Sequence, residues 1–421
     1  NKGWKQTGKN PYESIMGGDG MQVQVDDRNP DIVYTGYQFG NYYRINRATG
    51  KRTYIQPKHT LGETPYRFNW QTPIHLSKHN QDILYLGGNK LHRSLNKGTT
   101  WETISADLTT GGKKGNVAYG TLTSISESPF QFGVIYVGSD DGYIHVTKNG
   151  GGSWTRISND LPQNLWVSRV IASKHKKERV YATLNGYRFD DFNSYVYVSD
   201  DYGQTWKSIH KNLPISAVNV VKEDPENEHL LYVGTDNGVY VSLNSGTSWE
   251  VFRKNIPNVA VHDLVIQPTA KHLIIGTHGR SLYKADIAPL QKMTEDVLVK
   301  KAHIFAVKDI RKNSSWGRSW SPWRKANTPE LKIPFYSNST QKMNIAVFKD
   351  AVKVNTMKVL ADKGYNEVIF DVSFSKKGKR TFEKKNPKGD ALKAAKNGIF
   401  YLPKGKYVVK IGDEARAFEV K

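Results

Sequence analysis

One eight-residue pattern occurs four times in this chain. It reads Ser/Thr-x-Asn/Asp-x-Gly-x-Ser/Thr-Trp and is found as SLNKGTTW, TKNGGGSW, SDDYGQTW and SLNSGTSW. The pattern ends at Trp101, Trp154, Trp206 and Trp249, so successive copies lie 53, 52 and 43 residues apart. A period of this length is typical of one four-stranded blade of a β-propeller. The repeat therefore predicts an all-β chain whose blades surround a common axis.

The repeated pattern has the composition of a turn, and we interpret it as structural. Its Asn or Asp can accept hydrogen bonds from amides of the same turn, and its Gly can adopt a positive φ. Its Trp is expected to pack between neighbouring blades. The residues assigned to this scaffold are Asn96, Trp101, Asn149, Trp154, Asp201, Trp206, Asn244 and Trp249.

Six repeat units can be traced along the chain. The first, from about residue 21 to 57, has Tyr54 in place of the Trp, and the next four cover 70–110, 119–163, 167–215 and 217–258. The sixth begins at 262 and lacks a fourth strand. Because residues 3–11 resemble the outer-strand endings of other units, we expect residues 4–8 to pair with 281–286 and close the ring. This predicts a six-bladed propeller over residues 1–290; a seven-bladed ring would require further sequence.

Charge and pattern both change near residue 290. Residues 290–421 contain 29 Lys and Arg against 13 Asp and Glu, and they supply +16 of the net charge of +22. Short alternating segments replace the repeat and predict an immunoglobulin-like β-sandwich over 331–421. Residues 291–330 are expected to form a linker. It contains the aromatic cluster Trp316, Trp320 and Trp323, which we predict to dock the sandwich on the propeller.

The repeats also resemble a known family. The boxes are similar to the Asp boxes of bacterial sialidases, xyloglucanases and sortilin-type receptors. The segments NWQTPIHLSKHNQDILYLGGNKLHRS (69–94), NGYRFDD (185–191) and GTHGR (276–280) resemble large secreted bacterial sortilin-like proteins, often labelled glycosyl hydrolases. This resemblance covers about residues 1–290. It implies a protein that is secreted, displayed on the outer cell surface or periplasmic, with protein partners in an envelope complex.

Composition argues against several classes of structure and function. No apolar stretch approaches 18 residues, so no membrane-spanning segment is expected. The chain has no Cys, which excludes disulfides and thiolate zinc sites. Its lysines are scattered and no recognition motif for nucleic acid is present, so nucleic-acid binding is not expected. No cofactor is predicted.

Ligand binding is expected on one propeller face. Loops that enter the first strand and loops that join the second strand to the third share that face, opposite the repeated boxes. The predicted ligand-binding residues are Arg67, Asn69, Trp70, Arg169, Arg188, Asp191, His262, His278 and Arg280. Arg169, Arg188 and Arg280 either converge on an acidic group of a ligand or each pair with a local acid.

Catalysis is the alternative hypothesis. A glycoside hydrolase of xyloglucanase type needs two carboxylates about 5–10 Å apart, for which Asp19, Asp190 and Asp263 are the candidates. A sialidase would need a Tyr–Glu pair that the loops do not offer. A mixed metal site from His262, Asp263, His278 and Asp19 has no diagnostic spacing, and no metal is predicted. We therefore expect a non-catalytic module that binds a peptide or glycan or scaffolds an assembly.

Overall fold

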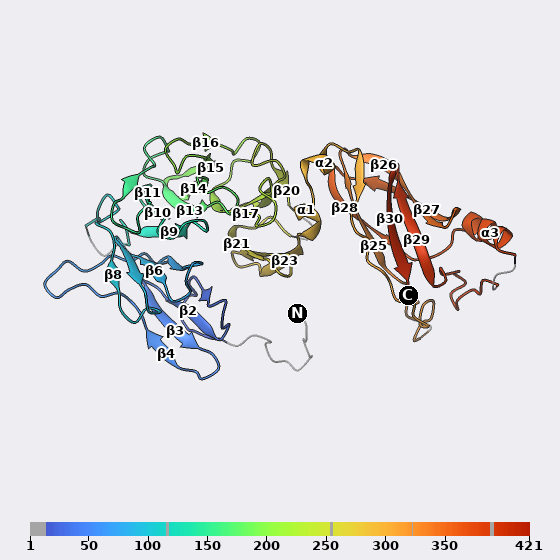
Figure 1. The fold of residues 1–421 in the computed structure, drawn as a ribbon, viewed down its shortest axis with the longest axis horizontal. Coiled ribbons are helices and arrows are strands. Elements are labelled where there is room, and N and C mark those ends of the chain that lie inside the picture. Colours follow the sequence, from blue (N-terminus) through green and yellow to red (C-terminus); the bar gives the residue numbers. More distant parts are fainter. Residues whose placement is uncertain (1–13, 115–117, 253–255, 322, 388–390) are drawn as a thin grey trace. The chain divides into compact units, whose positions relative to one another are not determined.

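The computed structural model describes residues 14–114, 118–252, 256–321, 323–387 and 391–421 (Figure 1). The chain divides into two compact units, residues 1–286 and residues 287–421. Each unit has its own sheets and its own core, and each is described by itself.

Unit 1 consists, in its described residues, of five four-stranded antiparallel sheets and one three-stranded sheet. In every sheet the strands follow one another in chain order. The first three sheets contain β1 (Gln24–Val25), β2 (Ile32–Tyr37), β3 (Asn41–Asn46) and β4 (Arg52–Tyr54); β5 (Ile74–Leu76), β6 (Leu84–Gly87), β7 (Leu91–Ser94) and β8 (Glu102–Thr103); and β9 (Leu122–Glu127), β10 (Ile135–Ser139), β11 (Ile144–Thr147) and β12 (Thr155–Arg156). The other three contain β13 (Trp166–Ala172), β14 (Val180–Gly186), β15 (Asp191–Ser199) and β16 (Lys207–Ser208); β17 (Val218–Glu223), β18 (Leu231–Thr235), β19 (Gly238–Ser242) and β20 (Glu250–Val251); and β21 (Val261–Gln267), β22 (His272–Thr277) and β23 (Leu282–Asp286).

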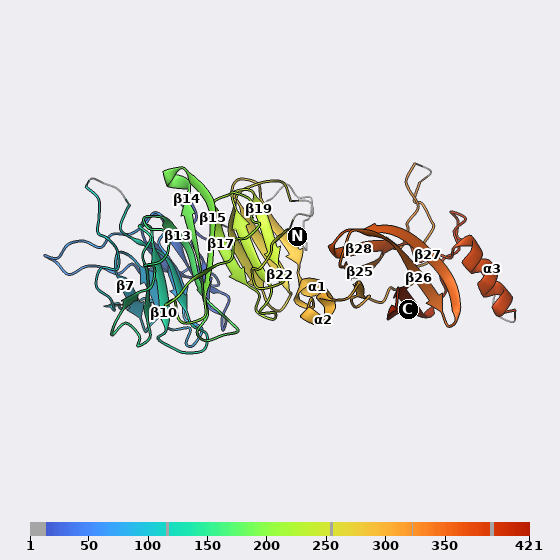
Figure 2. The same cartoon turned by 90° about the horizontal axis from the view of Figure 1, so that it is seen from above.

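The first strands of consecutive sheets are neighbours, in the order β1, β5, β9, β13, β17 and β21. Figure 2 shows β14, β15 and β17 of two adjacent sheets side by side, which agrees with their contacts. This arrangement confirms the predicted β-propeller. The predicted closing strand, residues 4–8, lies outside the described residues, so the closure and the number of blades stay predictions.

A second repeat, absent from the sequence analysis above, sets the register of the inner strands. Five buried tyrosines occupy the same position on the second strand of successive sheets: Tyr34, Tyr85, Tyr136, Tyr181 and Tyr232. Directly opposite them on the first strands stand Gln24, His75, Ser126, Ile171 and Lys222. Residues paired in this way share one face of a sheet. These five first-strand positions are therefore equivalent.

The repeated boxes form closed turns. In the third copy Asp201 accepts hydrogen bonds from the Thr205 amide at 2.9 Å and the Ser199 hydroxyl at 2.6 Å. The Gly203 amide donates to the Ser199 hydroxyl at 2.8 Å. Although burial opposes the shift, the hydrogen bonds from Ser199 and Thr205 lower the pKa of Asp201 to about 2. The other three copies repeat this geometry with Asn in place of Asp.

The Trp and Gly of each box contact the preceding sheet, as predicted for the Trp. The indole Nε1 atoms of Trp154, Trp206 and Trp249 donate to the backbone oxygens of Ile104, Ile157 and Ile209 at 2.9, 2.6 and 2.7 Å. Trp101 packs against the cluster that contains Ile55, but among the described residues its Nε1 has no acceptor.

Unit 2 contains two sheets that enclose one core. One sheet has the order β24 (Ala302–Ile304), β25 (Leu331–Ser337), β28 (Gly364–Phe370), and the other has β27 (Val352–Ala361), β26 (Gln341–Lys349), β29 (Gly405–Ile411), β30 (Glu414–Val420). The core cluster joins residues of both sheets. Its helices are α1 (Ala288–Gln291), α2 (Glu295–Leu298) and α3 (Lys376–Lys385). The immunoglobulin-like class of this unit stays a prediction.

The segment expected to be a linker contributes to unit 2. It supplies strand β24 and places Ile304, Val307 and Trp316 in the core of that unit. Strand β27 was not predicted, although buried Val352 and Val354 alternate with exposed Lys353. The apolar segment 399–403 forms no strand, since Tyr401 makes only an isolated bridge with Ser373.

Candidate functional site

Two buried glutamates join neighbouring sheets next to the inner strands of the propeller. Glu127 accepts hydrogen bonds from the Ser77 hydroxyl at 2.6 Å and the Tyr85 hydroxyl at 3.0 Å. Glu223 accepts from Ser173 at 2.8 Å and from Tyr181 at 3.1 Å. Both donor serines begin the tripeptide Ser-Lys-His, at 77–79 and at 173–175. The same local structure is thus built twice, two sheets apart.

The histidines of these tripeptides also bond to the following sheet. The Nε2 atoms of His79 and His175 hydrogen-bond to the backbone oxygens of Ser128 and Asp224 at 2.8 and 2.7 Å. In each tripeptide the Ser and the His are held by the following sheet. The Lys between them, Lys78 or Lys174, is consequently fixed at the end of its inner strand.

Four cationic side chains from the inner strands influence one another, and we call them the inner cationic cluster: Lys78, Arg169, Lys174 and Lys222. They come from the second, fourth and fifth sheets. Lys222 lies opposite Tyr232 and Ile171 lies opposite Tyr181, so Lys222 occupies the position equivalent to Ile171. Arg169 precedes Ile171 by two residues, which places it on the same face.

Burial and like charges lower the pKa of two lysines of this cluster. Burial, together with the charges of Lys174, Arg169 and Lys78, lowers the pKa of Lys222 to about 8, while Asp263 opposes the change. Burial and Lys78 lower the pKa of Lys174, while Glu223 and Asp224 oppose the change. Burial, with Lys78 and Lys222 nearby, lowers the pKa of His75 to about 4. In the described part of the chain neither Lys174 nor Lys222 forms an ion pair with a carboxylate. Lys78 forms an ion pair with Asp27 at 2.7 Å and Arg169 forms one with Asp263, so Lys174 and Lys222 are the members of the cluster whose charge has no such partner among the described residues.

One arginine of the cluster reaches a predicted acid. The Arg169 guanidinium lies 2.8 Å from the Asp263 carboxylate, so the fourth and sixth sheets are joined directly. Next to Asp263, the rings of His262 and His278 lie 5.2 Å apart. Burial lowers the pKa of His262, and the charge of His278 adds to the effect. The structure thus brings together four of the predicted residues and gives Asp263 a counterion.

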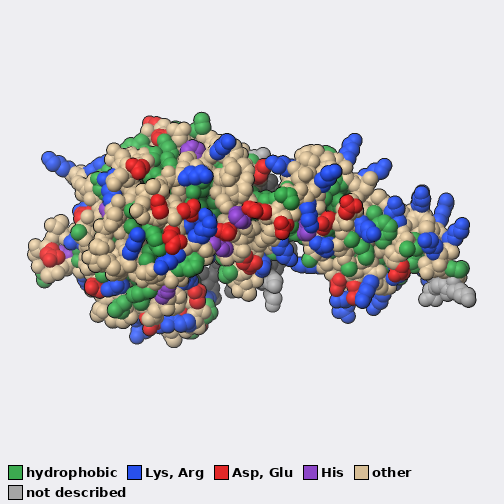
Figure 3. Space-filling model, turned by 45° about the horizontal axis from the view of Figure 1, so that its top comes forward, with side chains coloured by type: hydrophobic (Ala, Val, Ile, Leu, Met, Phe, Trp, Pro, Cys, Tyr) green, Lys and Arg blue, Asp and Glu red, His purple; other side chains and the backbone are tan. Residues whose placement is uncertain are grey.

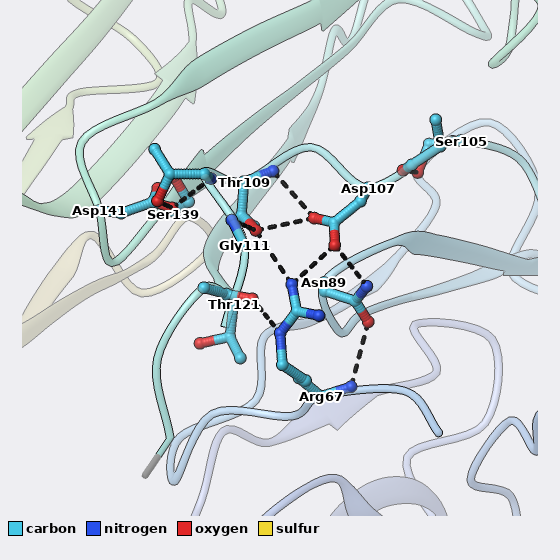
Figure 4. Close-up of polar contacts among 12 residues, drawn as sticks. Arg67, Asn89, Ser105, Asp107, Thr109, Gly111, Thr121, Ser139 and Asp141 are labelled. Carbon is cyan, nitrogen blue, oxygen red and sulfur yellow. Dashed lines mark hydrogen bonds and ion pairs between the residues drawn. The ribbon is translucent and has the colours of Figure 1, made fainter. Parts of the chain in front are cut away.

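Arg67 is engaged within the protein (Figure 4). Its guanidinium donates to the Asp107 carboxylate at 2.7 Å and to the Gly120 backbone oxygen at 3.2 Å. The Asn89 amide also donates to Asp107, at 2.9 Å, and its oxygen accepts from the Arg67 backbone. Burial opposes ionisation, but hydrogen bonds, including those from Thr109, Asn89 and Arg67, lower the pKa of Asp107. Arg67 therefore holds the loop before β9 in place.

Asn69 belongs to a second, fully buried network. Its side-chain nitrogen donates to the Thr121 hydroxyl at 2.8 Å and to the Asp140 carboxylate at 3.1 Å. Asp140 accepts in addition from the amides of Gly120 and Thr121. Burial raises the pKa of Asp140 while these bonds oppose the change. Asn69 is therefore a bracing residue in this structure.

Aromatic side chains are exposed around the same loops. Trp70 is 48% exposed, and its ring meets the half-exposed Phe39 edge to face at 5.3 Å. The Arg188 guanidinium lies 4.1 Å from the centre of the Trp166 ring, a cation–π geometry. Beside Arg188, Tyr187 is 59% exposed. Such surfaces suit stacking against a sugar or a peptide side chain.

The remaining predicted acids are Asp19, Asp190 and Asp191. Asp19 contacts the Gln38 amide. Asp191 accepts from the Asn193 amide at 3.0 Å and the Tyr195 hydroxyl at 2.8 Å. Asp190 ends a 3-10 turn with a positive φ of 56°. In the described residues Arg280 forms no ion pair, and no three His, Asp or Glu side chains are grouped as metal ligands.

Sequence reasoning missed the three lysines of the inner cationic cluster, because it considered loops and passed over inner strands. Two signals were present. Ser-Lys-His occurs twice, and the spacing of the tyrosines places Lys222 at the equivalent position of His75. A register drawn from those tyrosines would have identified the cluster as candidates.

Comparison with known proteins agrees with the resemblance noted from the repeats. Residues 194–321 match the Sortilin-Vps10 family, described as sortilin, neurotensin receptor 3. The sortilin-like character of the propeller is therefore confirmed over this part of the chain. No relative was found among curated proteins.

Several solved structures are similar at low identity. "YCF48 bound to D1 peptide" has 16% identity and a TM-score of 0.42, covering 65% of this chain and 82% of that chain. The GH74 enzyme of Niastella koreensis has 15% identity and a TM-score of 0.47, covering 94% of this chain and 65% of its own. The GH74 xyloglucanase of Xanthomonas campestris has 12% identity and a TM-score of 0.43, covering 86% and 55%.

Helices in unit 2 are short. Among the residues that the structure describes, none is long and apolar enough to cross a membrane.

Proposed function

We propose that this chain is a non-catalytic binding module, exported to the bacterial envelope, whose propeller binds a peptide or glycan that carries an acidic group. The observation that carries the proposal is the inner cationic cluster. Lys222 and Lys174 are held among other cations without an ion-pair partner in the described residues. Keeping such charges near one another destabilises the folded protein. An anionic ligand would neutralise them through charge-assisted hydrogen bonds.

Aromatic side chains lie at the opposite ends of the same inner strands: Trp70 precedes β5 and Trp166 begins β13, whereas Lys78 and Lys174 follow these strands, so an extended ligand could contact both. Trp70 with Phe39, and Arg188 with Trp166, present flat surfaces at the loops. Aromatic faces bind sugars and peptide side chains without requiring a unique sequence. A ligand with an acidic group and an apolar or sugar portion therefore matches the chemistry of the propeller better than a neutral one.

The positions of the acids argue against hydrolysis. A glycoside hydrolase needs one carboxyl group with a raised pKa facing a second carboxylate across the substrate. Asp263 is paired with Arg169. Asp140, whose pKa is raised, is buried and bonded to backbone amides. Neither group is placed to transfer a proton to a bound sugar.

Calorimetric titration tests the proposal. Oligogalacturonate, neutral xyloglucan oligosaccharides and acidic peptides would be titrated into wild type and Lys222→Met, with Lys177→Met as the control at an exposed lysine. We expect one acidic ligand to bind wild type and Lys177→Met, and to bind Lys222→Met about tenfold more weakly. Hydrolysis of the same polysaccharides would be followed in parallel. Steady turnover that is abolished by Asp19→Asn or Asp263→Asn would replace this proposal with the glycosidase hypothesis.

A further inference from the structure

A loop of unit 2 exposes two tryptophans almost completely. Trp320 is 91% exposed and Trp323 is 93% exposed, whereas the nearby Trp316 is only 8% exposed. The Trp316 ring lies 5.6 Å from that of Tyr401, within the core of unit 2. A fully exposed indole leaves a large apolar surface in water, and two of them lie three residues apart. We call residues 315–321 and 323–327, which carry them, the tryptophan loop.

Hydrogen bonds define the shape of the tryptophan loop. The Gly317 amide donates to the Asn327 oxygen and the Asn327 amide donates to the Arg318 oxygen, both at 2.8 Å. The Ser319 hydroxyl donates to the Arg324 oxygen at 2.6 Å, and the Arg324 amide donates to Ser321 at 3.1 Å. These bonds close the base of the loop, and Trp316 anchors it in the core. The two exposed indoles are therefore presented by a built turn.

Positive charge surrounds the two indoles. Arg318, Arg324 and Lys325 lie in the same loop, and the Arg324 guanidinium is 5.9 Å from the centre of the Trp320 ring. Across residues 287–421 there are 29 Lys and Arg against 13 Asp and Glu. Figure 3 shows many Lys and Arg side chains on the visible face of unit 2. The loop and its unit therefore attract an anionic surface.

We propose that the tryptophan loop inserts its two indoles into the headgroup region of an anionic lipid membrane. Tryptophan favours the interface between lipid and water, because its ring is apolar and its N–H can still reach a polar partner. Neighbouring Arg and Lys side chains are attracted to anionic lipids. The loop supplies both contributions at one point. It attaches unit 2 at the membrane surface, while the ligand site lies on the propeller.

Lipid fits the loop better than a protein partner does. A protein interface surrounds its anchoring aromatics with a ring of packed residues that excludes water. Around Trp320 and Trp323 the loop offers Ser319, Ser321 and charged side chains. Two indoles on a narrow polar loop can enter a fluid headgroup layer without a matching pocket.

The test measures vesicle binding by the chain of residues 1–421. Wild type, W320A/W323A and Leu360→Ala would be sedimented with phosphatidylcholine vesicles, with or without phosphatidylglycerol. Leu360 is the matched control, because it is a 68% exposed apolar residue of the same unit. We expect wild type and Leu360→Ala to bind only the anionic vesicles, and W320A/W323A to bind them about tenfold more weakly. Both altered tryptophans are exposed, so the melting temperature of the double variant should equal that of wild type.

Three outcomes would overturn the proposal. The first is equal vesicle binding by wild type and W320A/W323A, which would leave only a general attraction of basic protein to anionic lipid. The second is absence of vesicle binding together with binding of oligogalacturonate that W320A/W323A loses, which would assign the loop to an acidic glycan. The third is a lowered melting temperature of W320A/W323A, which would indicate that the indoles pack against protein. W320A/W323A alters unit 2 and Lys222→Met alters the propeller, so a loss of oligogalacturonate binding is assigned to one site or the other and the two proposals fail separately.

Discussion

Replacing Lys222 with Met is expected to stabilise the protein near neutral pH. Burial lowers the pKa of Lys222 from its ordinary value of 10.5 to about 8. If the side chain were fully desolvated, a pKa difference of this size would destabilise the folded state by about 3 kcal/mol. The side chain keeps partial contact with solvent, which screens the effect, so we expect about 1–2 kcal/mol. Met preserves the length of the side chain and removes the charge.

The sign of the pH dependence follows from the lowered pKa. Below about pH 8 Lys222 is protonated in both the folded and the unfolded protein, and the whole destabilisation is present. Between about pH 8 and about pH 10.5 the unfolded chain binds more protons than the folded one, so stability rises with pH. Above that range both forms are neutral and the destabilisation has gone. The difference between Lys222→Met and wild type must therefore shrink as pH rises.

Calorimetric thermal unfolding of the whole chain at about pH 7 and about pH 10 measures this difference. At the lower pH the transition of unit 1 should occur about 2–6 °C higher in Lys222→Met than in wild type. Lys177→Met, at an exposed lysine of the same unit, should unfold like wild type at both pH values. A Lys222→Met protein that is less stable than wild type at the lower pH, or equally shifted at both, would refute the reasoning. If Lys222→Met is more stable than wild type and also binds the ligand more weakly, then Lys222 contributes to binding while it destabilises the fold.

Three further predictions concern the boxes. Gly203→Ala should destabilise the protein by about 2–4 kcal/mol in urea unfolding, because φ is +88° and a Cβ would meet the Ile157 side chain. The control Gly50→Ala, at a φ of +72° with no neighbour within 4 Å, should lose only about 1–2 kcal/mol. Equal losses in the two variants would contradict the packing argument. Trp249→Phe should lose about 1–3 kcal/mol more than Trp101→Phe, since only the former leaves a carbonyl without its donor; similar urea midpoints would show the indole hydrogen bond to be negligible. Asp201→Asn should remove the loss of stability that wild type shows as pH falls from the ordinary carboxyl pKa of 3.8 towards about 2, and an unchanged acid unfolding curve would argue against ionised Asp201 as its source.

Much of the fold could be predicted because it depends on local chemistry that repeats. The box specifies its own turn through Ser199, Asp201 and Gly203, whatever surrounds it. Four identical turns, each ahead of a Trp, then require sheets that stack in series. Strand β27 was overlooked, although Val352, Lys353 and Val354 alternate between the interior and solvent.

The candidate site was predicted in part. Arg169 and Asp263 were expected in loops, whereas they lie in strands β13 and β21. Whether they bind a ligand or each other depends on how two non-adjacent sheets approach, and in this structure they pair at 2.8 Å. From the sequence, Arg67 and Asn69 were similarly predicted to be available to a ligand. The structure gives them Asp107, Gly120 and Asp140 as partners, supplied by other loops.

The sequence by itself determined the blade, because turn geometry, strand alternation and the contact of Trp with the preceding sheet are set by residues close together in the chain. Only the tertiary structure decided where charge accumulates. Lys78, Lys174 and Lys222 are separated by 96 and 48 residues, and nothing local to any of them indicates the other two. Burial and like charges from neighbouring strands lower the pKa values of Lys174 and Lys222, because electrostatic energy depends on distance in space and on local solvation.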